Sequence, residues 1–406
     1  MYLNFAWRYF KGKKTTNAIN IIAWVTTGVI AFATCCQILV LCVFNGFEGL
    51  VQSLYSSFYA DMKIVPEKGK TFRLTPLVFD QIKKIDGVQS ASCIIEEKAL
   101  LQNSNAQSVI QLKGVDSNFI KVSGVPDKIT EGSFDLGNDV EPGVILGSGI
   151  QYATGISLEP GLIEEKNTVI LPKMNVPGTD PVASISEGII NPSGVFSIQQ
   201  EFDNSYAITN IDFVRQHIGL EEDQFTSVEL KLQPNADENK IKQKLQNILG
   251  RGFVVQNKYE QNTSLYQTMK IEKWVIYAVL TLILVIAAFN MISALTMLVL
   301  EKKQDISILQ SMGTSRMQIK KIFLSEGLLL GIIGTVTGIA FATVICLLQI
   351  KFQFIKLNGG SFLIHYFPVK LVLTDFLLVG ATALIITFIA SWFPAQKASK
   401  QPISLR

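Results

Sequence analysis

Four long stretches of the chain are almost free of charged residues. Residues 19–44, 274–300 and 327–350 contain none, and residues 371–393 contain only Asp375. A transmembrane helix needs about 20 consecutive, mainly apolar residues, and each of these stretches is longer than that. We therefore expect four transmembrane helices, which we place at residues 19–45, 274–300, 322–350 and 371–393.

Helical patterns extend beyond both ends of the first stretch. Residues 1–18 combine aromatic and basic side chains around Trp7 and Arg8, a mixture that favours the membrane interface. After residue 45, apolar residues recur at a spacing of three and four through Phe58. We expect a helix along the cytoplasmic membrane surface at the start, and a helix that continues beyond the membrane after the first span.

The segment between the first two spans, residues 46–273, has a mixed pattern. Short apolar runs are separated by glycine and proline, which is typical of strands and short helices joined by turns. We expect strands at residues 62–66, 88–96, 99–102, 109–115, 143–146, 168–171, 194–199, 206–208, 227–232 and 253–255, and helices at 77–85, 147–155, 211–218 and 238–249. This order predicts an α+β domain, either as one body or as two subdomains on the two sides of Gly143.

Residues 166–191 form an unusual part of that domain. They contain three prolines and follow a predicted strand, so we expect a protruding loop or a bent hairpin. One interpretation is a tolerated surface insertion. The other is a contact arm for another protein, because exposed loops on a rigid scaffold often carry binding residues. The candidate contact residues are Met174, Val176, Pro177 and Ile185.

The connector between the second and third spans, residues 301–321, is amphipathic. Charged and polar residues crowd its start, and four apolar residues follow at Ile306, Ile308, Leu309 and Met312. Gly313 suits a helix C-terminus, and residues 314–316 suit the turn into the next helix. A solvated loop is one interpretation of such a charge run. The ordered apolar positions instead favour a short helix that lies on the membrane surface or docks into a partner.

Small residues recur along the third span at every third or fourth position: Gly327, Gly331, Gly334, Gly338 and Ala342. Such a stripe lets a neighbouring helix approach closely. We expect this face of the helix to point into the protein. Pro394 is expected to end the fourth span, because proline interrupts helical hydrogen bonding.

Composition and charge agree with a membrane protein. Of 406 residues, 48% are hydrophobic and only 17% are charged, against about 25% charged in soluble domains. Four Lys or Arg residues precede the first span, and five lie in the 301–321 connector. Because basic residues favour the cytoplasmic side, we place both termini (including a tail at 394–406) and the connector there. The 46–273 domain and the 351–370 loop are then outside.

The sequence carries no recognisable catalytic machinery. It contains no G-x-x-x-x-G-K-[ST] phosphate loop, and its two histidines, His217 and His365, are far apart in the sequence. Only Cys93 of the five cysteines lies in the 46–273 domain, so no disulfide can form within that domain. We expect no catalytic residue, no metal site and no nucleic-acid partner.

Several short motifs carry a family resemblance. They are Ala6-Trp7-Arg8-Tyr9, Phe44-Asn45-Gly46-Phe47-Glu48, Leu112-Lys113-Gly114-Val115-Asp116, Val144-Ile145-Leu146-Gly147, Gly194-Val195-Phe196, Ala288-Phe289-Asn290-Met291-Ile292, Glu301-Lys302 and Asp305-Ile306-Ser307-Ile308-Leu309. With these motifs the chain resembles the permease subunits of lipoprotein-releasing transporters, the LolC/LolE group, within the FtsX/MacB-like permease superfamily. The resemblance covers essentially the whole chain.

The resemblance implies a bacterial inner-membrane ABC transporter in which two permease chains pair with two copies of a separate ATPase. ATP and Mg²⁺ would bind the ATPase, and no cofactor is expected in this chain. The connector would be the coupling helix that docks into the ATPase. Its expected contact residues are Glu301, Lys302, Asp305, Ile306, Leu309, Met312 and Gly313.

The resemblance also implies a substrate and a carrier. An acylated lipoprotein would leave the membrane through an apolar cavity and pass to a periplasmic carrier that contacts an arm at residues 172–192. The expected cavity residues are Phe44, Phe47, Leu50, Met269 and Phe289. Two alternatives remain: a MacB-like exporter of another amphiphile, and an FtsX-like protein that signals to a cell-wall hydrolase. The sequence also leaves open whether the second permease is a copy of this chain or a paralogue.

Overall fold

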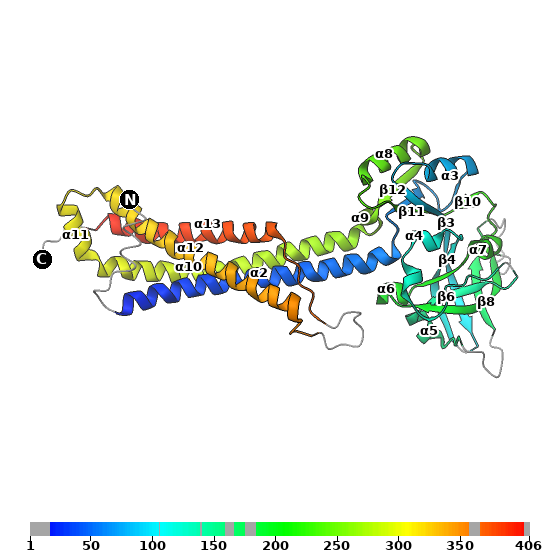
Figure 1. Cartoon of the computed structure of the whole chain (residues 1–406), viewed down its shortest axis with the longest axis horizontal. Coiled ribbons are helices and arrows are strands. Elements are labelled where there is room, and N and C mark those ends of the chain that lie inside the picture. Colours follow the sequence, from blue (N-terminus) through cyan, green and yellow to red (C-terminus); the bar gives the residue numbers. More distant parts are fainter. Residues whose placement is uncertain are drawn as a thin grey trace. The chain divides into compact units, whose positions relative to one another are not determined.

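The computed structural model describes residues 17–104, 106–138, 140–158, 166–174, 184–356 and 366–401. Two compact units are present (Figure 1). We call Met1–Leu50 with Gln267–Arg406 the helical unit, and Val51–Tyr266 the sheet unit. Most of the expected interfacial helix at 1–18, and the expected contact residues Val176 and Pro177, lie outside the described residues.

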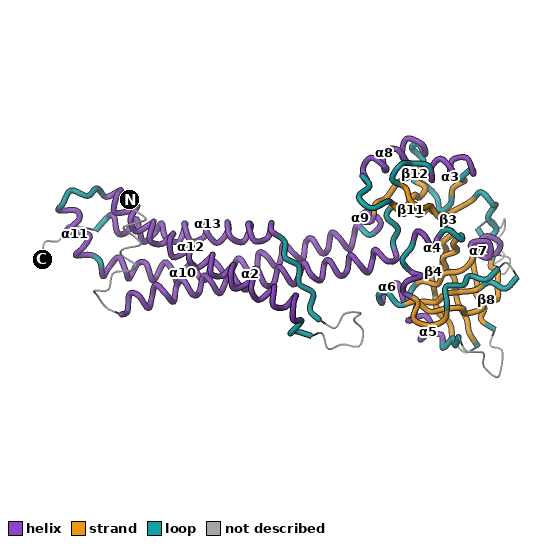
Figure 2. Tube along the Cα trace, in the orientation of Figure 1, coloured by secondary structure: helices purple, strands orange, loops and turns teal. Residues whose placement is uncertain are grey.

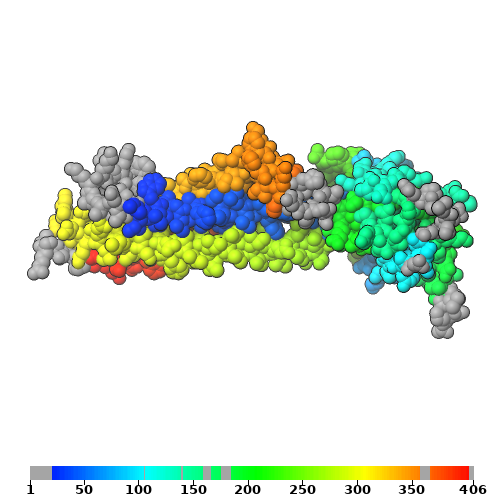
Figure 3. All heavy atoms as spheres, turned by 90° about the horizontal axis from the view of Figure 1, so that it is seen from below, coloured from blue at the N-terminus to red at the C-terminus, as the bar shows by residue number. Residues whose placement is uncertain are grey.

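Five helices make up the described helical unit (Figure 2). They are α2 (Asn17–Phe58), α10 (Thr263–Glu301), α11 (Lys303–Ser311), α12 (Arg316–Phe352) and α13 (Leu373–Ser399), of which α2 and α10 continue into the sheet unit. All but α11 are long and apolar enough to cross a membrane. Helices α2 and α10 run side by side (Figure 3), and Gln37 of α2 donates a hydrogen bond to Thr281 of α10 at 3.1 Å. The expected helical continuation of the first span to Phe58 is confirmed.

Helix α13 does not end at Pro394, so that expectation was wrong. The helix continues to Ser399 with Pro394 buried inside it. A proline removes one helical hydrogen bond and disfavours the helix. Here Ala395 and Ala398 are fully buried in a hydrophobic cluster with α10, α11 and α12, and this packing keeps the last turns helical.

The stripe of small residues on α12 faces inward, as expected, but contacts two different helices. A Cβ on Gly327 or Gly331 would collide with side chains of α13, at 2.2 Å from Ser391 Oγ and 2.6 Å from Thr387 Oγ1. A Cβ on Gly338 would lie 2.5 Å from the Ala31 carbonyl oxygen of α2. The stripe therefore allows α12 to pack closely against α13 along one part and against α2 along the next.

The sheet unit has twelve strands and eight short helical segments in its described residues. The strands are β1 (Met62–Pro66), β2 (Phe72–Arg73), β3 (Val88–Asn103), β4 (Ala106–Val115), β5 (Ile129–Gly132), β6 (Gly143–Gly147), β7 (Asn167–Pro172), β8 (Ile185–Phe196), β9 (Tyr206–Asn210), β10 (Gln224–Phe225), β11 (Ser227–Leu232) and β12 (Phe253–Asn257). The helices are α3 (Pro76–Lys83), α4 (Phe119–Val122), η1 (Val125–Lys128), α5 (Ser148–Thr154), α6 (Gln200–Asp203), α7 (Ile211–Ile218), α8 (Glu238–Leu249) and α9 (Lys258–Gln261). The unit is α+β, as the sequence predicts.

Ten of the strands join one sheet, and six of them close a ring. The ring runs β3–β4–β9–β6–β8–β7, because β7 pairs with β8 on one side and with β3 on the other. Strands β11, β1 and β12 extend the sheet from β3, and β5 adds to β8. The strands on both sides of Gly143 therefore belong to one sheet, whereas the sequence left two subdomains open.

Two strands are longer than the sequence predicts. Residues 88–96 and 99–102 form one strand, β3, because β4 pairs with it continuously from Ile94 to Asn103. Strand β8 starts at Ile185, inside the segment expected to be a loop or bent hairpin. Strands β7 and β8 are antiparallel, with Pro172 opposite Ile185, so the hairpin alternative is confirmed in the described residues.

Successive residues of the central strands feed two hydrophobic clusters. Ile95 and Leu146 belong to the larger cluster, whereas their neighbours Ile94 and Ile145 belong to the smaller one. This alternation follows from the period of two in a strand. The smaller cluster also contains Phe58 at the end of α2, whose ring stacks on Phe202 at 4.3 Å between centroids. The last turns of α2 are thereby part of the sheet unit's core.

Candidate functional site

Helix α11 is held in place by a buried apolar side chain and a hydrogen bond. Ile306 is 1% exposed and packs in a cluster with residues of α10, α12 and α13, among them Val299, Ile319 and Ala398. Gln310 of the same helix donates a hydrogen bond to the Gln401 carbonyl at 3.4 Å. The helix is therefore anchored to the ends of three long helices, and its position follows theirs.

Backbone geometry defines both the end of α11 and the start of α12. Gly313 has φ +90°, which favours glycine, and its N–H donates to the Gln310 carbonyl at 3.0 Å. The Thr314 N–H donates to the Leu309 carbonyl at 3.0 Å, which completes a Schellman motif. Ser315 then caps α12 through a capping box with Gln318. The expected helix end at Gly313 and the turn after it are confirmed.

The sequence suggested that the apolar residues of α11 share one face of the helix. In the structure they do not. Ile306 points into the protein, whereas Ile308 is 59% exposed and Met312 is 77% exposed. Leu309 is half-buried. The two large exposed side chains form what we call the α11 patch. Ile306 is thus unavailable to a partner and serves to position the helix, which corrects its expected contact role.

Charged residues flank the α11 patch. Lys302 and Asp305 form an ion pair at 3.2 Å in which the Asp305 side chain is 45% exposed. Glu301 is exposed and is the last residue of α10. An exposed apolar patch with a charged rim is typical of a protein-binding surface.

Two exposed apolar residues, Ile308 and Met317, were missing from the expected contact set. Met317, in the first turn of α12, is 63% exposed. The signal was present in the sequence, because an apolar residue two positions after the capping Ser315 has no reason to lie in a solvated first turn. Met317 therefore joins Ile308 and Met312 as an exposed apolar residue of the connector.

The structure does not bring the five expected cavity residues to one place. Lys273 at the start of the second span hydrogen-bonds to Asn45, next to Phe44 and Phe47. Phe289 lies sixteen residues further along α10, or about 24 Å away at 1.5 Å per residue. Leu50 and Met269 are half-buried. Phe289 therefore belongs to a different part of the helical unit from Phe44 and Phe47.

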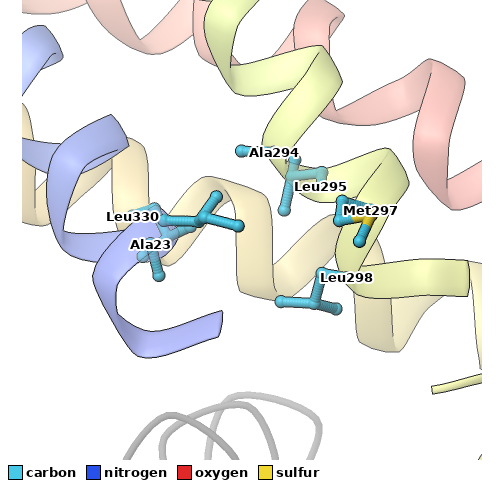
Figure 4. A pocket seen from close by; sticks show the side chains of 7 residues that line it. Ala23, Ala294, Leu295, Met297, Leu298 and Leu330 are labelled. Carbon is cyan, nitrogen blue, oxygen red and sulfur yellow. The ribbon is translucent and has the colours of Figure 1, made fainter. Parts of the chain in front are cut away.

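The described part of the helical unit contains apolar hollows. Figure 4 shows side chains from α2, α10 and α12 that line one of them, with Ala23, Leu295 and Leu330 among them. Its volume is about 10 Å³. That space has room for about one water molecule and cannot hold an acyl chain. A groove of about 240 Å³ between α10 and α13 includes Phe289 and Phe393 in its lining.

The two described contact residues of the expected arm, Met174 and Ile185, lie at the base of the β7–β8 hairpin. The Met174 N–H donates to the Ile218 carbonyl at 3.0 Å, and the Met174 side chain packs on the larger core cluster. Ile185 is 40% exposed at the start of β8. Only Ile185 of these two thus presents its side chain largely outward.

Comparison with known proteins identifies the class of the chain. Residues 277–403 match the FtsX-like permease C-terminal family. The chain is 29% identical to the lipoprotein-releasing system transmembrane protein LolC of Neisseria meningitidis over 97% of this chain and 95% of that protein. It is 25% identical to LolE of Haemophilus influenzae over 97% of this chain and 96% of that protein.

A solved structure of the periplasmic region of MacB from Actinobacillus actinomycetemcomitans is also similar. The two chains share 15% sequence identity, and their structures align with a TM-score of 0.37. The alignment covers 55% of this chain and 98% of the MacB chain. Its C-terminal part matches an FtsX-like permease family, and the relatives together with the four apolar helices indicate a multi-pass protein of the inner membrane. Over nearly its full length the chain is similar to the LolC/LolE group of lipoprotein-releasing permeases, which confirms the resemblance seen in its motifs.

Proposed function

We propose that this chain is the permease subunit of an ATP-driven ABC system that extracts acylated lipoproteins from the bacterial inner membrane. The support is its similarity to LolC and LolE over nearly its full length. Four long apolar helices provide the membrane part, and a large α+β unit provides the part outside it. We infer that both termini and α11 are cytoplasmic and that the sheet unit is periplasmic.

The observation that carries the mechanism is the α11 patch. Two large apolar side chains are exposed on a helix whose own position is set by buried Ile306. We propose that a separate ATPase covers this patch and binds ATP and Mg²⁺, with two ATPase copies for two permease chains. Because Ile306 contacts the ends of α10, α12 and α13, a push on α11 would move those helices.

The lipid part of the substrate would be handled by the apolar surfaces of the helical unit. Acyl chains need no hydrogen bonds, so a surface without charge suits them. We propose that Phe44, Phe47, Leu50 and Met269 lie along the exit route, near the end of the membrane helices where the sheet unit begins. Phe289 would contact lipid or a second permease instead, because it lines the groove of α10 and α13.

Removing residues 175–183 and joining Met174 to Ser184 through a short Gly-Ser linker is expected to abolish carrier binding. The pairing of β7 with β8 and the Met174 backbone bond stay intact, so the sheet unit is expected to fold. Co-purification of the periplasmic carrier measures the effect. Normal carrier binding by the shortened chain would place the contact elsewhere, and unchanged co-purification of the ATPase is the control.

The proposed function is tested by purifying the tagged chain from detergent-solubilised membranes and identifying every partner. We expect an ATPase, a second permease and either a lipoprotein or its carrier. Depletion of the chain should also leave lipoproteins in the inner membrane. Recovery of a cell-wall hydrolase with the ATPase would favour an FtsX-like signalling role. Recovery of no ATPase would overturn the proposal.

A further inference from the structure

Three polar side chains from three long helices meet inside the helical unit, at the end opposite α11. Lys273 Nζ of α10 lies 3.0 Å from Asp375 Oδ2 of α13 and 2.9 Å from Asn45 Oδ1 of α2. Asn45 Nδ2 closes the triangle by donating to Asp375 Oδ2 at 2.7 Å. Each side chain contacts the other two. We call these residues the clamp.

The clamp is only partly exposed to solvent. Asn45 is 3% exposed, and the side chains of Asp375 and Lys273 are 13% and 29% exposed. Asp375 is the single charged residue of an otherwise apolar 23-residue stretch, 371–393. A charge in such surroundings is costly unless it is paired, and separating a pair that is already desolvated leaves two unpaired charges.

A neighbouring segment holds the clamp in register. The Lys370 N–H donates to the Cys42 carbonyl of α2 at 3.0 Å, and the rings of Phe47 and Phe367 pack edge to face at 5.7 Å. Gly46, next to Asn45, has no room for a Cβ, which would lie 2.2 Å from the Pro368 carbonyl oxygen. The segment leading into α13 is therefore seated on α2, and this places Asp375 beside Asn45.

The fourth long helix joins the same end through a buried amide. Gln349 of α12 is 6% exposed, and its Nε2 donates to the carbonyls of Ile355 and Phe367 at 3.1 and 3.3 Å. Its Oε1 accepts from the Ile355 N–H at 3.1 Å. Since Phe367 packs on Phe47, α12 is also connected to α2 here. These contacts therefore connect α2, α10, α12 and α13 at this end of the unit.

We propose that Asn45, Lys273 and Asp375 hold α2, α10 and α13 together throughout the transport cycle, so that these helices move as one body. The role rests on the proposed function, in which an ATPase moves α11 at the other end of α10 and α13. Without the clamp, a displacement of α11 would spread the helices apart instead of moving their far ends. The three residues are positioning residues and need not touch the lipoprotein.

The test replaces the polar clamp by a covalent one that can be opened. In a chain whose native cysteines are changed to alanine, the substitutions are Asn45→Cys, Asp375→Cys and Lys273→Met. A short reagent with two methanethiosulfonate groups joins the two new thiols in the assembled complex, because each thiol forms a disulfide with the reagent and displaces one methanesulfinate. A thiol reductant then breaks both disulfides. We expect the cross-linked complex to release lipoprotein within about twofold of the cysteine-free parent, and release to fall at least tenfold when the link is reduced.

Two outcomes would overturn the clamp. Loss of release on cross-linking would mean that α2 and α13 must separate during the cycle. Full release after reduction would mean that the connection is not needed. ATP hydrolysis is measured in both states, because a purely structural defect would lower hydrolysis and release together, whereas an open clamp lowers the amount released per ATP. Glu272→Gln, an exposed neighbour of Lys273, is the matched control and should change neither quantity.

A stability measurement separates failure of the clamp from failure of the proposed function. If the parent complex releases no lipoprotein, the proposed function fails, and the clamp is judged by thermal unfolding of the full chain. Lys273→Met and Asp375→Asn are then expected to lower Tm non-additively, and the charge-swapped Lys273→Asp/Asp375→Lys chain to be more stable than either single charge reversal. Additive losses with no recovery in the swap would overturn the pairing itself.

Discussion

Replacing Ile308 and Met312 together by aspartate is expected to reduce ATPase binding by at least about 100-fold. Burial of one such side chain in an interface contributes about 1.5–3 kcal/mol. Losing both side chains from the interface therefore weakens the binding free energy by about 3–6 kcal/mol. Each 1.4 kcal/mol corresponds to a factor of about ten in affinity. Both side chains are largely exposed in the chain itself, so the substitutions should leave its fold intact.

The measurement is the affinity of the purified ATPase for the detergent-solubilised permease, together with ATP-dependent lipoprotein release. Gln304→Asp is the matched control, because it adds a charge at an exposed position of the same helix without altering the α11 patch. Ile306→Asp gives the opposite contrast, since it places a charge in a buried cluster and should destabilise the chain. Unchanged ATPase affinity in the double variant would mean that α11 is not the docking element.

The second large effect is expected in the sheet unit, where Lys113→Met should lower the free energy of unfolding by about 3–5 kcal/mol. Lys113 and Glu229 form a fully buried ion pair, with 2.7 Å between Nζ and Oε1 and side-chain exposures of 2% and 3%. The Lys113 ammonium also lies 4.9 Å from the ring centroid of Phe58, the last residue of α2. Removing Lys113 leaves the Glu229 carboxylate buried without its partner.

The surrounding charges reinforce this pair. Burial alone would raise the pKa of Glu96, but the charges of Lys63 and Lys113 outweigh it, and the pKa lies below its usual range. Burial alone would likewise lower the pKa of Lys63, but Glu96 and Glu229 outweigh it, and the pKa lies above its usual range. Glu96 and Lys63 therefore stay charged at neutral pH, and the cluster around Lys113 is ionic.

Thermal unfolding of the full-length chain measures the loss. For a unit of this size the expected decrease in Tm is roughly 10 °C, at about 2–4 °C per kcal/mol. The double variant Lys113→Met/Glu229→Leu should recover most of it, because a buried ion pair can be replaced by apolar residues at little cost. Lys98→Met, an exposed lysine on β3, should change stability by less than about 0.5 kcal/mol. Equal losses in the single and double variants would show that the ion pair contributes little beyond its packing.

Local sequence patterns determined most of the secondary structure. Helices α7 and α8 and strand β11 have the predicted bounds, because apolar periodicity and capping residues act over a few positions. The Asp237 side chain caps α8 by accepting from the Lys240 N–H, and Gly313 ends the α11 segment with a positive φ. The four long apolar helices follow from length and composition, which need no tertiary information.

Structural features that depend on neighbouring strands and helices were predicted less well. Polar residues at Glu97 and Lys98 suggested a break between two strands, yet β3 is continuous because β4 pairs along it. Apolar spacing grouped Ile306 and Ile308 among the apolar positions of one amphipathic helix, but only the packing of α10, α12 and α13 decides that Ile306 is buried and Ile308 exposed. Burial depends on what lies opposite a residue, and the sequence of one element does not contain that information.

The clamp shows the same division between sequence and tertiary structure. Asn45 was recognisable in the sequence as part of a family motif, and Asp375 as the lone charge of an apolar stretch. Nothing in the spacing of residues 330 positions apart indicates that Asn45 and Asp375 hydrogen-bond. The sequence determined that the chain is a membrane permease with an α+β unit and an amphipathic connector. Only the tertiary structure brought the three polar residues together, because their meeting depends on how four long helices pack.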